Sequence, residues 1–139
     1  MIYPGRESAT RVAQLAGIPR ENWMQDWPTE VSDPARLDEF VHLLFANKTD
    51  WELSFWLLDL VLESARDHLA IAPTQDHLPE RTEQLIDTLV AVFEATRAPA
   101  LAQSLQYWAC LDASGPDEMF GVSPLVREAR RRIGDSART

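Results

Sequence analysis

The chain has little of what most catalytic and cofactor sites are built from. It contains a single cysteine, Cys110, which excludes an intramolecular disulfide and a zinc site made of several thiolates. Only five glycines occur in 139 residues, so the tight glycine-rich loops that hold phosphate groups are hard to build. No serine lies in a nucleophile-elbow motif. The sequence therefore predicts no catalytic residue and no cofactor.

Long apolar runs are also missing. No stretch approaches the roughly 20 uncharged apolar residues that a membrane-spanning helix needs. The first ten residues, MIYPGRESAT, lack the basic and then apolar segments of a secretory signal. We therefore expect no membrane association, and cytoplasmic residence.

Basic residues are scarce outside the carboxyl-terminal tail. The chain has 13 Lys and Arg against 22 Asp and Glu, a net charge of −9. Residues 123–139 hold five arginines and two acids, whereas residues 1–122 hold 8 basic and 20 acidic side chains. An acidic body repels a phosphate backbone, so the charge disfavours nucleic acid and favours a basic protein partner. The simpler interpretation is that the charge serves solubility alone.

The sequence does have proline and capping residues at regular intervals, and these residues mark the expected helix boundaries. Its length and its 45% hydrophobic content fit a single domain, residues 1–139. The expected fold class is all-α, with a short helix at about 8–16 and main helices at about 34–46, 50–70, 79–96, 99–111 and 123–134.

Capping residues give the expected helix ends. Asp33 is predicted to cap the first main helix, and Thr49 with Glu52 forms a capping box for the second. Gly17 and Gly134 are predicted to end the short amino-terminal helix and the last helix, because glycine readily adopts the left-handed conformation found there.

Short turns join the first main helix to the second and the third to the fourth, which predicts two antiparallel hairpins over residues 34–112. Pro34 and Pro79 are 45 residues apart (79 − 34), an offset that resembles HEAT and armadillo repeats. A short HEAT-like stack and a closed helical bundle both fit this pattern. Residues 1–33, with Trp23 and Trp27, are predicted to form a packed cap.

The helix at 50–70 carries its acids on one strip, with a tryptophan inside it. Acids on the helix at 79–96 form a second strip. A tryptophan ringed by polar side chains is typical of a binding anchor, although a neighbouring helix or the amino-terminal segment could equally cover Trp56. The predicted partner-binding residues are Glu52, Trp56, Asp59, Glu63, Asp67, Glu80, Glu83 and Asp87.

An alternative is a metal-binding helical-bundle enzyme. Glu39 and His42 have the spacing with which helical bundles present a carboxylate and an imidazole to iron or manganese. A di-metal site needs a second such pair, and neither His68 nor His77 follows a glutamate by three residues. Glu39 and His42 are therefore metal ligands only in this alternative.

A third interpretation is a DNA-binding regulator. Residues 11–26 resemble the helix-turn-helix of bacterial repressors at Ala13, Gly17 and Ile18. The segment departs from that family at Trp23 and Asp26, where the recognition helix would have small or branched apolar residues.

In size, acidity and helical content the chain resembles bacterial immunity and antitoxin proteins. That resemblance rests on general character and assigns no residue a role. It implies a non-enzymatic module that neutralises a basic toxin by covering a functional surface. With the strips above, the sequence predicts that the chain docks a basic partner through an acidic, tryptophan-containing helix face.

Overall fold

The structure of the protein, a computed structural model, describes residues 6–18, 28, 31–71, 78–110 and 122–138. Every regular element in these ranges is helical, which confirms the all-α fold class. The elements are α1 (Arg6–Ala16), the short 3-10 helix η1 (Pro34–Arg36), α3 (Leu37–Ala46), α4 (Trp51–Ile71), α5 (Leu78–Thr96), α6 (Pro99–Ala109) and α7 (Ser123–Arg138).

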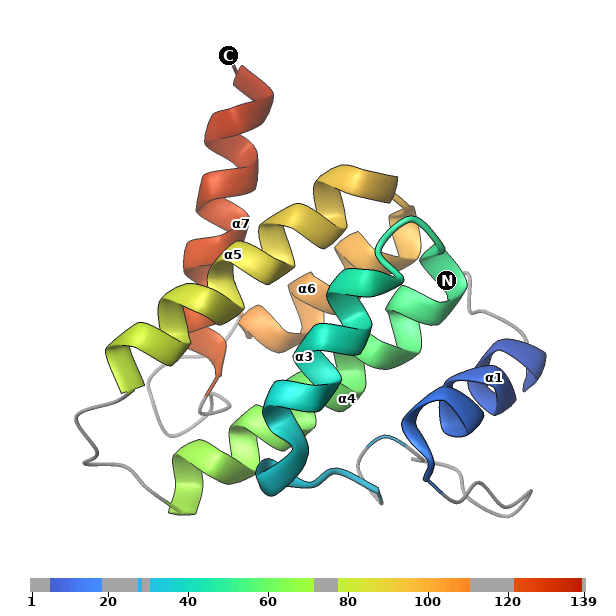
Figure 1. The fold of residues 1–139 in the computed structure, drawn as a ribbon. Coiled ribbons are helices and arrows are strands. Elements are labelled where there is room, and N and C mark those ends of the chain that lie inside the picture. The colour runs from blue at the N-terminus through green and yellow to red at the C-terminus, as the bar shows by residue number, and fades with distance from the viewer. Residues whose placement is uncertain (1–5, 19–27, 29–30, 72–77, 111–121, 139) are drawn as a thin grey trace.

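The helices pack as a compact two-layered bundle (Figure 1). α3 and α5 lie side by side and run in the same direction, while α4 and α6 lie behind them and run the opposite way. α1 packs against α4 at one edge, and α7 packs against both α5 and α6 at the other. This arrangement places one face of α3 and α5 at the surface of the bundle.

The core is centred on α4. Leu57, Leu60, Val61 and Leu62 have no exposed surface, because α1, α3 and α6 contact α4 on different sides. Burying each such side chain contributes about 1.5–3 kcal/mol relative to an exposed one. The other helices contribute their apolar faces, including the fully or almost fully buried Val12, Phe40, Leu44, Leu89, Val92, Leu101, Trp108 and Val126.

The residue that caps the amino-terminal end is the predicted one at the first main helix and a different one at the second. Asp33 Oδ1 accepts a 2.9 Å hydrogen bond from Ala35 N, so Asp33 does cap the first turn, which is the 3-10 helix η1. The capping box predicted from Thr49 is wrong. Asp50 Oδ1 accepts from the backbone N–H groups of Glu52 and Leu53 at 3.1 and 3.2 Å. A carboxylate accepts a hydrogen bond from the unpaired N–H groups of a first helical turn more strongly than a threonine hydroxyl does. Asp50 rather than Thr49 therefore caps α4, which begins at Trp51.

The carboxyl-terminal ends also differ in part. Gly17 has φ +65° and follows α1, as predicted. Gly134 does not end α7, which continues to Arg138. Glycine inside a helix costs about 1 kcal/mol but does not break it, and no proline follows. α6 ends at Ala109, two residues before the predicted Leu111, which lies outside the described residues.

Cys110 ends α6 in a left-handed conformation, with φ 50° and ψ 52°. Arg127 of α7 holds this end by donating from Nε to Ala109 O at 2.7 Å and from Nη2 to Cys110 O at 2.5 Å. A residue with a Cβ is strained in this region, whereas glycine is not.

We expect Cys110→Gly to raise the free energy of unfolding by about 1 kcal/mol, because it relieves this strain. Urea denaturation followed by circular dichroism measures the change. Cys110→Ala is the matched control, since it removes the thiol and keeps the Cβ. An equal gain in both variants would assign the effect to the thiol and contradict the strain.

Candidate docking groove

Trp56, the predicted anchor, is partly covered by α1. Its indole Nε1 donates a 2.9 Å hydrogen bond to Ser8 Oγ, and its ring meets Phe55 edge to face with centroids 5.1 Å apart. The side chain is half-buried and packs against the core. Trp56 therefore helps to hold α1 on α4.

The two acids that follow Trp56 on α4 lie against α6. Trp108 Nε1 donates to Asp59 Oδ1 at 3.1 Å, and the buried Glu63 lies 3.7 Å from Arg66 Nη1. Burial raises the pKa of Asp59 to about 6; the indole hydrogen bond opposes this rise and the nearby charge of Glu63 adds to it. Burial, followed by the charges of Glu63 and Asp59, also raises the pKa of Tyr107.

The strip predicted on α4 is thus divided between two neighbouring helices. Trp56 bonds to α1, and Asp59 bonds to α6. Glu52 is half-buried in the first turn of α4. Asp67 lies in α4 and Glu80 in α5, but both side chains are outside the described part. The partner-binding role of this strip stays a prediction.

The acids of α5 that the structure describes face outward. The side chains of Glu83 and Asp87 are 59% and 75% exposed. Arg132 of α7 contacts both, with Nη2 3.1 Å from Glu83 Oε1 and Nη1 3.3 Å from Asp87 Oδ1. Its Nε also donates to Glu128 Oε1 at 3.0 Å. Hydrogen bonds to Glu83 and Glu128 raise the pKa of Arg132, and hydrogen bonds from Arg131 and Arg132 lower the pKa of Glu128 to about 2.

A groove of about 440 Å³ lies between α3 and α5. This volume is in the range of sites that hold small ligands or single anchoring side chains. Apolar side chains from both helices line it, together with carboxylate, imidazole, amide and hydroxyl groups. The lining residues are Leu37, Asp38, Val41, His42, Phe45, Gln84, Leu85, Asp87 and Thr88.

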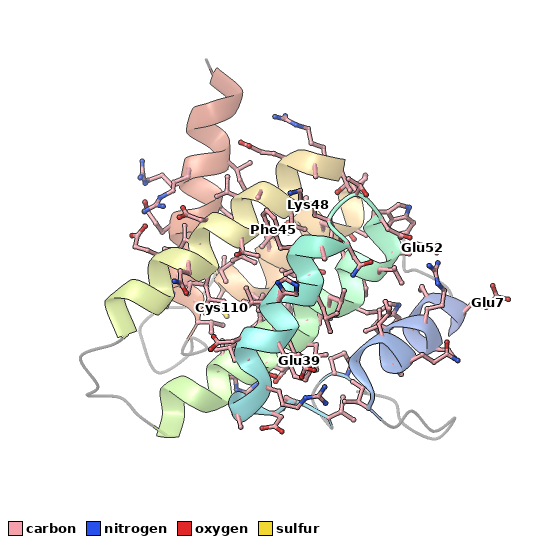
Figure 2. The ribbon with its side chains drawn as sticks, viewed as in Figure 1. Glu7, Glu39, Phe45, Lys48, Glu52 and Cys110 are labelled. Atoms are coloured by element: carbon pink, nitrogen blue, oxygen red, sulfur yellow. The ribbon has the colours of Figure 1, made fainter. Side chains whose placement is uncertain are left out.

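Phe45 is an exposed large apolar residue of the groove, with 47% of its surface accessible to solvent. Figure 2 shows it near the end of α3, close to Lys48, whose Nζ lies 3.6 Å from the ring centroid. This contact is a cation–π interaction. The groove has no signal in the sequence of α3, because the helical pattern indicates that His42 and Phe45 lie away from the core face but does not indicate that α5 runs beside them.

Glu39 and His42, the metal ligands of the alternative interpretation, contact different parts of the molecule. His42 lines the groove, whereas Glu39 Oε2 lies 2.6 Å from Arg36 Nε, and this hydrogen bond lowers the pKa of Glu39. Within the described ranges, no three His, Cys, Asp or Glu side chains are grouped so that they could hold a metal ion.

No family model, curated protein or solved structure matches this chain. Among the described residues, no helix combines the length and the apolar character needed to cross a membrane. Of the helix-turn-helix segment at 11–26, residues 19–26 lie outside the described part, so that resemblance stays untested.

Proposed function

We propose that the chain is a non-enzymatic protein-binding module that docks a basic segment of a partner protein in the groove between α3 and α5. One observation carries the proposal: an apolar groove floor lies directly beside exposed carboxylates. Leu37, Val41 and Leu85 supply apolar lining, and Asp87 supplies a charged edge. Interfaces commonly combine a desolvated apolar centre with a polar rim.

Charge complementarity selects a basic partner. Asp38 lies on the α3 side of the groove, Asp87 lies on the α5 side, and Glu83 is one helical turn from Asp87. The chain as a whole carries a net charge of −9. Such a field increases the association rate of a basic partner, while affinity comes from the apolar anchor.

The groove also suits a partner helix better than an irregular loop. The lining residues Leu37, Val41 and Phe45 recur every four residues along α3, and α5 runs beside α3 in the same direction (Figure 1), so the groove follows the two helices. An amphipathic helix presents its anchors along one such line, at positions i, i+3, i+4 and i+7. A basic toxin neutralised in the cytoplasm, as in immunity and antitoxin systems, is the specific partner class that we propose.

We expect a tagged chain, recovered from its native cells, to bring down a stoichiometric basic protein, and Phe45→Ala to weaken that complex about tenfold. Truncating an exposed aromatic anchor at an interface commonly has an effect of this size. Isothermal titration calorimetry with the identified protein measures the loss.

Leu15→Ala is the matched control, because Leu15 is 48% exposed and lies on α1, away from the groove. It should leave the affinity unchanged. Recovery of no stoichiometric partner, or equal affinities for the Phe45 and Leu15 variants in their folded forms, would contradict the proposal.

A further inference from the structure

An arginine of the chain itself already lies at the acidic edge of the groove. Glu83 and Asp87 are four residues apart on α5, so their carboxylates extend from successive turns of one helix face. The two terminal nitrogens of Arg132 divide between them, at 3.1 Å from Glu83 and 3.3 Å from Asp87. The carboxylate spacing therefore matches the fork of a guanidinium.

This arginine contact belongs to the groove as well as to the junction of α5 and α7. Asp87 lines the groove and also accepts from Arg132 Nη1. A guanidinium at this position consequently lies at the groove wall that Asp87 forms, on the same helix as the apolar lining residue Leu85. An amphipathic partner helix with an apolar anchor in the groove could place an arginine here.

The contact can also be exchanged at little cost. Glu83 and Asp87 are mostly exposed, and exposed ion pairs contribute little net stability because water solvates the separated charges well. Arg132 would keep a partner after leaving them, since its Nε donates to Glu128 one turn back on α7 at 3.0 Å.

We infer, on the basis of the proposed function, that Glu83 and Asp87 form an arginine subsite of the groove. Arg132 fills the subsite in the free chain, and an arginine from an amphipathic partner helix fills it in the complex. The carboxyl-terminal helix thereby sets the affinity of the groove, because a partner must compete with a guanidinium that is already present.

The probe is a synthetic helical peptide of leucine, alanine and arginine, with the arginines along one edge of its apolar face. We expect it to shift the backbone amide NMR signals of groove residues on α3 and α5. Arg132→Gln removes the competing guanidinium and should tighten peptide binding about threefold. The reason is that a weak ion pair with Arg132 reduces, by a similar factor, the fraction of chains whose subsite is open to the peptide.

Arg130→Gln is the matched control, because it removes the same charge from the same helix and has no described contact with α5. It should leave the affinity within the error of the measurement. A peptide with citrulline in place of arginine keeps the shape and loses the charge, and its binding should not respond to Arg132→Gln.

Equal affinities for the Arg132 and Arg130 variants, or the same gain with the citrulline peptide, would overturn the arginine subsite. The absence of shifts on α3 and α5 would overturn it too. None of these results bears on the partner recovered from native cells, because Phe45→Ala tests the proposed function separately.

Discussion

Replacing Trp108 with alanine is expected to lower the free energy of unfolding by about 4 kcal/mol, the largest effect we expect of any single substitution. Trp108 is only 2% exposed and lies in α6 where this helix meets α4 and α7. Its indole donates to Asp59 on α4, and its backbone carbonyl accepts from Ser123 Oγ of α7 at 2.8 Å. Alanine would leave a large cavity and would deprive Asp59 of its donor.

The neighbouring residue supplies the control for this prediction. Tyr107 is 63% exposed, and its ring meets that of Trp108 edge to face at 5.6 Å. Tyr107→Ala should cost less than about 1 kcal/mol, because it removes mainly surface contacts. Urea denaturation of both variants measures the difference. Equal costs at the two positions would contradict the central packing role of Trp108.

The burial of Trp108 could be predicted from the sequence. Leu101, Leu105 and Trp108 recur with helical spacing, a pattern that predicts one buried face on the helix at 99–111. All three are buried. The periodicity of apolar residues indicates which side of a helix faces the core, because the fixed rotation of about 100° per residue decides which side chains share a face.

Local ends were harder to predict, because contacts distant in the sequence contribute to them. Cys110 ends α6 two residues early, and the carbonyl groups at that end are bonded by Arg127, 17 residues further along the chain. Nothing in the residues around Cys110 indicates that α7 will supply this guanidinium.

The candidate site has the same limitation. The sequence placed Trp56 and Asp59 on one polar strip, which is correct for an isolated helix. It could not show that Ser8, 48 residues away, accepts from Trp56, or that Trp108, 49 residues away, donates to Asp59. The groove has no local signal for the same reason, since it exists only where α3 and α5 meet.

Asp59 leads to the second large prediction, which concerns pH. Its pKa in the folded protein is about 6, against an ordinary value of 3.8, chiefly because burial disfavours the charged carboxylate. The folded state therefore binds this proton more tightly than the unfolded state does. The contribution of Asp59 to stability is fully present below about pH 4 and is lost as the pH rises through about 6.

We expect Asp59→Asn to be more stable than the wild-type protein near pH 7, by up to about 3 kcal/mol. Asparagine carries no charge to desolvate, and its side-chain oxygen can still accept from the Trp108 indole. The advantage should shrink as the pH falls through about 6 and should vanish near pH 3, where the wild-type carboxyl is protonated in both the folded and the unfolded state.

Urea denaturation at a series of pH values measures this difference between variant and wild type. Taking the difference cancels the titration of the other carboxylates, and Glu94→Gln, at an exposed position of α5, controls for the loss of one negative charge. Carboxyl ¹³C NMR gives the Asp59 midpoint directly. A pH-independent difference between about 4 and 7, or a variant less stable than wild type near pH 7, would contradict the prediction, since either result requires the charged form to be well accommodated between α4 and α6.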